Sequence, residues 1–298
     1  MKGFRYYWFN KGRRRTTLIA YLFIAPVVIY SIAFNFAPMF ASFYLSFTRY
    51  NMLTPPTWIG IRNYVRVLFD DPVFWTALKN TAQYSLEVIP LNILISLSLA
   101  LLVNRAVRGI NFFRALFYLP VVTSIIAVSM IWLWLYDYNS GLINLALDVF
   151  RIGPIDWLGD YRLALHSLVI MRVWKGVGWN MVIYLAGLQG IPLYLYEAAE
   201  IDGASAWKKF TSITWPSLRP VTMYIIIMAT ISTFQTFGEI YAMTGGGPLD
   251  STTTVGYLIY QRAFQYYNMG EASTVAFLLF GIIFSLSFVN MKFFQGND

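Results

Sequence analysis

Few side chains in this sequence could carry out catalysis. The 298 residues include one His and no Cys, which excludes disulfides, Cys-ligated metals and thiol nucleophiles. The single His166 is more typical of a hydrogen-bonded side chain than of a metal ligand. The residues with chemical potential are instead charged side chains within apolar stretches, namely Glu87, Arg172, Lys175 and Glu239.

These charges within apolar stretches are more typical of a transporter for polar cargo than of an enzyme. A charge within a membrane-spanning stretch costs about 2.5 to 3.5 kcal/mol on insertion scales and usually faces a polar cavity. Arg172 and Lys175 are one helical turn apart. Their side chains can either extend to the outer membrane interface or line a vestibule, where with Glu239 they bind polar cargo or pair across the cavity. Glu87 is interpreted as a structural partner for such a cation.

The composition places these charges in a membrane protein. Hydrophobic residues make up 58% of the chain and charged residues 12%, whereas soluble domains contain about 25% charged residues. The net charge of +8 is attributed to Lys and Arg that set membrane topology, and not to binding of nucleic acid. We expect a basic cytoplasmic N-terminus over residues 1–15 and one transmembrane domain over residues 16–298, with no room for an ATPase.

Six stretches are free enough of charge to cross a membrane as helices. They cover residues 16–48, 80–103, 115–136, 163–189, 221–243 and 272–291. Pro26 and Pro38 mark expected kinks or ends in the first. Six spans place both termini on one side. If that side is the cytoplasm, the inner segments carry thirteen Lys and Arg and the outer loops six, which predicts cytoplasmic termini.

The inner loop between the fourth and fifth spans has an unusual sequence. Good helix formers occupy 196–201, Gly203 is a natural helix end, and 206–213 can start a second helix, with Pro216 closing it. Acidic residues precede Gly203 and two lysines follow it, which favours docking of a partner. The alternative is an amphipathic helix lying on the bilayer, but three acids within six residues argue against contact with lipid headgroups.

This loop closely resembles the EAA signature of binding-protein-dependent ABC importer permeases. The matching residues are Glu197, Ala198, Ala199, Asp202, Gly203, Ala204, Ile213 and Pro216, whereas Trp215 replaces the usual Leu before the proline. The resemblance implies an all-α polytopic protein with the six transmembrane helices of the type I ABC importer core. It also implies that the coupling segment, residues 196–216, fits a cleft of an ATPase subunit. Glu197 would then make a polar contact, Gly203 would supply the bend, and Ala198 and Ala204 would allow close approach.

The resemblance extends over almost the whole chain. Residues 174–179 and 185–192 look like the fourth core span of carbohydrate permeases of the maltose and glycerol-phosphate type. The turn at 244–248 resembles that of one permease subunit of such pairs, the maltose-F-like half. By this resemblance, the cargo-contacting positions are Arg172, Gly176 and Trp179 on the fourth span and Phe234 and Gln235 on the fifth.

The cargo expected from these features is a sugar or oligosaccharide. Sugars stack apolar C–H faces on aromatic rings and need paired hydrogen-bonding groups, and the fourth and fifth spans mix both residue types. Arg172 stands where related sugar permeases often have a neutral polar residue, which suggests an acidic cargo. A glycerol-phosphate-type or other polar solute is the alternative.

The resemblance also implies the partners and the location. We expect a second permease subunit, two ATPase subunits that bind ATP and Mg, an extracytoplasmic solute-binding protein and a bacterial-type cytoplasmic (inner) membrane. This chain itself would hold no cofactor or metal and catalyse nothing. An ion-coupled secondary transporter would need a coupling site, for which only Glu87 and Glu239 are candidates. A membrane enzyme would need a nucleophile and a base, which one His and no Cys supply poorly.

Overall fold

A computed structural model of the protein describes residues 11–104 and 108–295. The described residues are mostly helical and include one two-stranded sheet, in which β1 and β2 pair antiparallel through Thr48–Trp58 and Arg49–Thr57. In chain order the elements are α1 (Lys11–Ser31), η2 (Ile32–Phe36), α2 (Ala37–Ser46), β1 (Thr48–Arg49), β2 (Thr57–Trp58), α3 (Arg62–Val65), η3 (Arg66–Asp70), α4 (Pro72–Val103), α5 (Ile110–Val122), α6 (Ile125–Leu135), α7 (Leu142–Val149), α8 (Ala164–Gln189), α9 (Leu193–Ile201), α10 (Ala206–Lys209), η4 (Phe210–Thr214), α11 (Trp215–Ser217), α12 (Arg219–Phe234), α13 (Gly238–Met243), α14 (Val255–Tyr260), η5 (Gln261–Gln265) and α15 (Met269–Gln295).

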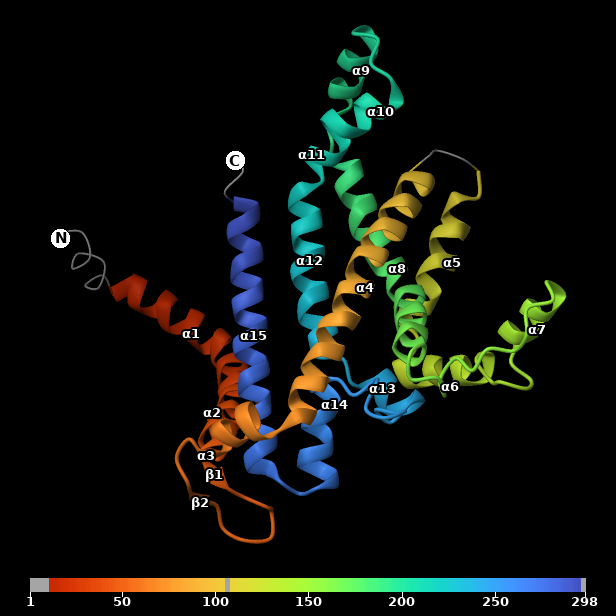
Figure 1. Ribbon diagram of the computed structural model, residues 1–298. Helices are drawn as coiled ribbons and strands as arrows, with labels where there is room; N and C mark the ends of the chain where they lie inside the picture. The colour runs from red at the N-terminus through yellow and green to blue at the C-terminus, as the bar shows by residue number, and fades with distance from the viewer. Residues whose placement is uncertain (1–10, 105–107, 296–298) are drawn as a thin grey trace.

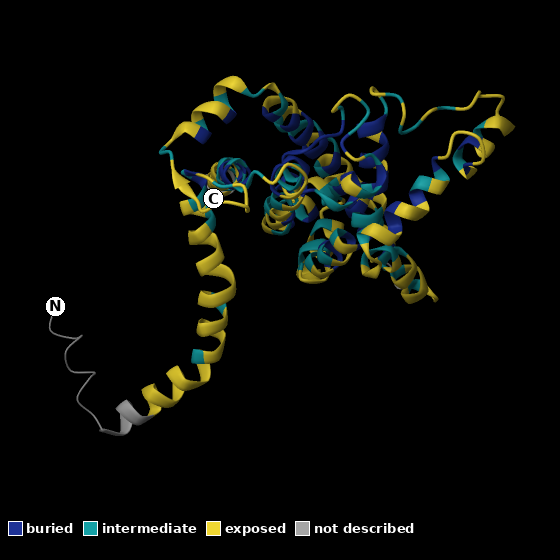
Figure 2. Cartoon of the chain, turned by 90° about the horizontal axis from the view of Figure 1, so that it is seen from below, coloured by how far each residue is buried: buried dark blue, intermediate teal, exposed yellow. Residues whose placement is uncertain are grey.

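The first span forms one long helical run, of which α1 stands away from the rest of the chain whereas α2 packs against α15 (Figures 1 and 2). Its most apolar window is fully exposed. The run changes to π-helix at Ile32–Phe36, where the backbone N–H of Ala37 bonds to the carbonyl of Ile32. Pro38 follows directly and has no N–H to give, which explains the irregularity there. Pro26 lies within α1, so of the two prolines only Pro38 lies beside a helix boundary.

A bundle of long helices forms the body. α4 packs along α8, and α12 lies against α4 and α15 (Figure 1). α4 begins eight residues before the predicted span because the Asp71 carboxylate accepts the backbone N–H groups of Val73 and Phe74 at 3.1 and 3.4 Å. Pro72 takes the first helical position, where no N–H is required.

Two of the predicted spans are not continuous helices. α5 and α6 meet at 98°, so the straight span expected over 115–136 is wrong. The span expected over 221–243 ends at Phe234 and resumes as α13. Hydropathy reports only how apolar a stretch is and does not give the direction of a helix. The directions of these helices are set by Pro120 and by close packing of Gly238 on Ile125, whose side chain lies 2.9 Å from where a β-carbon on Gly238 would be.

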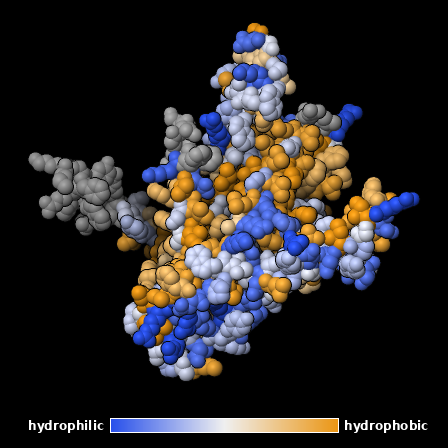
Figure 3. Space-filling view, in the orientation of Figure 1, coloured by the Kyte–Doolittle hydropathy of each residue, from blue (hydrophilic) through white to orange (hydrophobic). Residues whose placement is uncertain are grey.

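Length and composition identify three membrane-crossing helices among the described residues, or up to five if each bent pair counts as one span. The three are Thr16–Ser46, Pro72–Val103 and Met269–Lys292. α8 is 26 residues long but is not among them, and it carries Arg172 and Lys175. Figure 3 shows the apolar surface of the bundle with more polar surfaces beyond its two ends.

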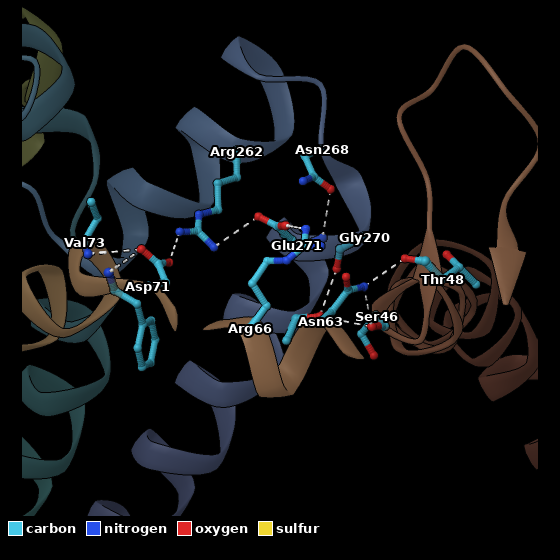
Figure 4. Close-up of polar contacts among 12 residues, drawn as sticks. Ser46, Thr48, Asn63, Arg66, Asp71, Val73, Arg262, Asn268, Gly270 and Glu271 are labelled. Atoms are coloured by element: carbon cyan, nitrogen blue, oxygen red, sulfur yellow. Dashed lines mark hydrogen bonds and ion pairs between the residues drawn. The ribbon is translucent and has the colours of Figure 1, made fainter. Parts of the chain in front are cut away.

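A network of charges joins the ends of four elements on the predicted outer side (Figure 4). Arg262 of η5 is buried and pairs with Asp71, before α4, and with Glu271 of α15. Glu271 also pairs with Arg66 of η3, at 2.6 Å. Each buried charge therefore has a partner of opposite sign, as burial of charge requires.

A second set of bonds fastens the first span to the last (Figure 4). The amide of Asn63 donates to the carbonyls of Ser46 and Thr48 at 2.9 and 2.8 Å. The hydroxyl of Thr274, on α15, donates to the Ser46 carbonyl at 3.0 Å. A β-carbon on Gly270 would lie 2.2 Å from the Thr48 carbonyl oxygen, so only glycine permits this approach.

Candidate functional site

The coupling segment projects beyond the bundle as a pair of short helices (Figure 1). α9 ends at Ile201, and Gly203 turns the chain with φ of +70°, a conformation that glycine adopts without strain. The Ser205 hydroxyl accepts the N–H of Lys208 and caps the next helix. The helix expected to close at Pro216 runs on to Ser217, and the chain then bends by 60° into α12. The predicted helix–glycine–helix shape is confirmed.

The segment holds its own shape through a few internal bonds. Lys209 pairs with Glu200 at 2.6 Å across the glycine turn. The hydroxyls of Tyr196 and Thr214 are 2.9 Å apart and join the two helical arms. The N–H of Ala204 donates to the carbonyl of Ala199 at 2.8 Å, which closes the turn. These contacts join the two arms to each other, and Phe210 packs the segment against the apolar core of the bundle.

The remaining surface of the segment is left free for a partner. Ile201 and Trp207 are 87% and 73% exposed. Among the described residues, Glu197 has no hydrogen-bond or ion-pair partner. Ala198 and Asp202 are exposed, and Ala204 and Ile213 are half-buried. Exposed apolar side chains rimmed by charge are typical of a protein-binding surface.

A second candidate site is a cavity of about 270 Å³ lined by residues of α4, α5, α8 and α12. Four predicted pathway residues line it: Arg172, Lys175, Gly176 and Trp179. The wall also contains polar groups that the sequence analysis did not select, namely Asn92 of α4 and Tyr224 and Ser232 of α12. Asn92 could have been found by the signal used for the charges, because a polar side chain in an apolar span usually faces a cavity.

Glu239 lies behind this cavity. It is 2% exposed and accepts hydrogen bonds from the hydroxyls of Tyr84 at 2.8 Å and Thr236 at 2.6 Å. Its carboxylate is 3.6 Å from the guanidinium of Arg172. Of the two arrangements left open by the sequence, the structure therefore shows Arg172 and Glu239 paired. Arg172 still lines the cavity, with a side chain that is 25% exposed.

The two other predicted pathway residues do not join this cavity. Phe234 is 6% exposed and packs in an apolar cluster with Phe74 and Val275. Gln235 lines a separate cavity of about 290 Å³ beside α14 and α15. The break after Phe234 separates these side chains from the wall formed by the rest of α12. A cargo role for either residue stays a prediction.

Glu87, predicted to be a structural partner for a cation in the spans, pairs with a different residue. Glu87 lies 2.7 Å from Nδ1 of His166 and accepts the amide of Gln83 at 3.0 Å. It therefore pairs with a histidine and not with Arg172 or Lys175. Among the described residues, no group of three or more His, Asp or Glu side chains could hold a metal ion.

Comparison with known proteins accounts for this combination of a coupling segment and a polar cavity. Residues 92–296 match the family model described as the binding-protein-dependent transport system inner membrane component. The chain belongs to this family. The protein is thus an ABC transporter permease, a multi-pass component of the inner membrane.

The permease has relatives that match it along almost their whole length. It is 38% identical to the probable ABC transporter permease protein YesP of Bacillus subtilis, over 95% of this chain and 92% of YesP. It is 36% identical to the trehalose/maltose transport system permease protein MalF of Thermococcus litoralis, over 95% and 96% of the two chains. The lactose transport system permease protein LacF of Rhizobium radiobacter is 36% identical, over 90% and 91%.

A solved structure shares the fold. A bacterial ABC transporter involved in the import of the acidic polysaccharide alginate contains a chain that superposes with a TM-score of 0.84, at 22% identity, over 94% of the permease and 96% of that chain. The type I importer core expected from the sequence is confirmed by this match.

Proposed function

We propose that the permease forms half of the translocation pathway of an ATP-driven importer for a sugar or oligosaccharide. A second permease subunit supplies the other half, and a binding protein delivers cargo from outside. Two ATPase subunits supply the energy and bind ATP and Mg, so this chain is not itself catalytic. Both termini, including residues 1–15, of which 1–10 lie outside the described residues, face the cytoplasm in this arrangement.

The exposed coupling segment is the observation that carries the proposal. Trp207 and Ile201 of this pair of helices are exposed, and the Glu197 carboxylate has no hydrogen-bond or ion-pair partner among the described residues. The segment is continuous through a 60° bend with α12, which lines the cavity. Closure of ATPase subunits on ATP would push the segment, and α12 would carry that displacement to the cavity wall. Alternating access then follows, with the cavity open outward on ATP binding and inward after hydrolysis.

The cavity supports a carbohydrate as cargo. Trp179 and Tyr224 offer ring faces for C–H groups, and Asn92 and Ser232 offer donors and acceptors for hydroxyls. The names of MalF and LacF, which transport trehalose or maltose and lactose, are consistent with this class. The wall contains two cations, Arg172 and Lys175, and no carboxylate, because Glu239 lies behind it. This excess of positive charge favours a cargo with an acidic group. A glycerol-phosphate-type or other polar solute remains the alternative.

The proposal is tested by uptake into cells that express the whole transport system. ATP-dependent uptake of a sugar, retained when a protonophore collapses the ion gradient and ATP is maintained, is expected. Uptake that follows the ion gradient would overturn the proposal.

The acidic cargo is tested by Arg172→Gln. The ratio of uptake of acidic to neutral sugars is expected to fall about tenfold or more, because the cavity loses one of its two positive charges. An unchanged ratio would exclude a role for Arg172 in selecting acidic cargo. Uptake of glycerol phosphate in preference to both sugar classes would instead establish the alternative.

A further inference from the structure

The break between α5 and α6 leaves backbone carbonyls without helical partners. α5 ends at Val122, two residues after Pro120, and Thr123 is extended before α6 begins at Ile125 and leaves at 98°. No N–H group follows in register to bond the last carbonyls of α5. Non-helical backbone within a membrane is tolerated only where protein or water satisfies it. The Thr123 hydroxyl donates to the Pro120 carbonyl at 2.6 Å, and the Val121 and Thr123 carbonyls have no such local donor among the described residues.

Lys175 of α8 supplies a donor to these carbonyls. Its ammonium donates to the carbonyl oxygens of Pro120 at 3.2 Å, Val121 at 3.3 Å and Thr123 at 2.9 Å. An ammonium has three N–H donors and no acceptor, so these three contacts match its whole capacity. A cation at the C-terminal end of a helix is also favoured by the helix dipole. The lysine thus acts as a C-terminal cap delivered from another helix.

Gly178 brings α8 close enough for this cap to form. It follows Lys175 by one helical turn and lies on the same face of α8. A β-carbon there would be 2.1 Å from the carbonyl oxygen of Phe117 on α5. The two helices are thus in backbone contact at Gly178 and joined by the ammonium one turn away. Two fixed points of this kind set both the distance and the relative rotation of α5 and α8.

The break that Lys175 caps forms part of the cavity. Val121 lies on the cavity wall. α6 packs against α13, the helix that carries Glu239. The position of α5 and α6 relative to α8 therefore determines the shape of the cavity and the place of the carboxylate behind it.

We propose that Lys175 is a positioning residue that holds the α5–α6 break against α8, and that it is not a ligand for cargo. Its three donors are all bonded to backbone. Arg172, one turn away on the same wall, has one ionic partner among the described residues, at 3.6 Å. Arg172 is then the cation left to meet cargo. The second part rests on the proposed function, whereas the first does not require the cargo to be a sugar.

The test uses the absence of native cysteine from the chain. Ser124→Cys places one thiol in the break, at an exposed position whose hydroxyl caps no helix. Its labelling by a membrane-permeant maleimide is measured in membranes containing the assembled transporter, with Lys175 intact or replaced by Arg, Gln or Met. We expect the labelling rate to rise in that order, by fivefold or more for Lys175→Met. Lys175→Arg keeps the charge and should remain close to the parent.

Uptake of an acidic and of a neutral sugar is measured with the same variants. A positioning role predicts that Lys175→Met lowers uptake of both by the same factor, while Arg172→Gln changes their ratio and leaves the labelling rate unchanged. A rise in KM for the acidic sugar alone, with labelling unchanged, would show that Lys175 binds cargo and would overturn the inference. An unchanged labelling rate in every Lys175 variant would also overturn it.

The labelling measurement is independent of the proposed function. It needs no cargo, so an importer that carries no sugar could still give the expected order of rates. The amount of each variant in the membrane is measured in parallel. If Lys175→Met does not reach the membrane, the rates of the Arg and Gln variants decide the outcome.

Discussion

Replacing Gly203 by alanine tests whether the coupling segment needs the left-handed backbone conformation at this position. Comparison with a larger side chain then tests whether the partner needs the space beside it. Gly203 has a φ of +70°, and no atom lies within 4 Å of where a β-carbon would be. The substitution therefore causes no clash within the chain and costs only the strain of a left-handed alanine, about 1 to 2 kcal/mol. That cost lowers the ratio of chains with the native turn to chains with a relaxed turn about 5- to 30-fold. Gly203→Asn adds more bulk with less strain, because Asn enters this region more readily.

The assay is retention of the ATPase subunits when the tagged permease is purified from membranes, together with ATP-dependent uptake. If docking requires this turn, Gly203→Ala lowers both, by a factor of at most about 5 to 30. If the partner also fills the open space above the glycine, Gly203→Asn lowers retention at least as much, despite its smaller strain.

Gly60→Ala is the matched control. Gly60 has a φ of +63°, has no atom within 4 Å of a β-carbon position, and lies in the first predicted outer loop. It imposes a similar strain far from the coupling segment and should leave ATPase retention unchanged. Full retention and uptake with Gly203→Ala, or equal losses with both alanine variants, would refute the reasoning.

Two further predictions concern the helices around the cavity. Gly178→Ala should destabilise the permease by about 1 to 3 kcal/mol, seen as a lower melting temperature in detergent, because its β-carbon would lie 2.1 Å from the Phe117 carbonyl oxygen. Gly281→Ala, with no atom within 4 Å, should be neutral or stabilising, and equal effects at both glycines would contradict the packing argument. Glu239→Gln should lower stability by about 1 to 3 kcal/mol, because Arg172 loses its charged partner. A double variant with Arg172→Gln should recover part of that loss, and strict additivity would show that the pair is not coupled.

Local sequence signals predicted the coupling segment well. Gly203 and the helix formers on either side of it determine backbone conformation within a few residues, so no distant contact was needed to place the turn. The same holds for the ends of α8, predicted over 163–189 and found at Ala164–Gln189. The charges in apolar stretches also indicated the polar cavity, because their cost requires a polar surrounding.

The sequence could not predict what depends on the direction of a helix or on distant partners. The 98° break after Pro120 involves packing between residues far apart in the sequence, such as that of Gly238 on Ile125. The early start of α4 was missed for another reason, because the Asp71 cap is a local signal that a search for charge-free stretches does not consider. Phe234 and Gln235 were predicted together on the pathway, yet the end of α12 turns them toward different surroundings. The pairing of Glu87 with His166 likewise joins residues 79 positions apart.

The attachment of the first span has a consequence for the order of events during synthesis. The contacts that fasten Ser46 and Thr48 to the body come partly from α15, which is synthesised after the other described helices. Until then the helix over Thr16–Ser46 lacks this attachment, and it must remain in the membrane by its own hydropathy. The contacts between this helix and α15 therefore form only after the helices between them have been synthesised. A chain truncated before α15 should still insert this first helix, held at its end by Asn63 but without the contacts from α15.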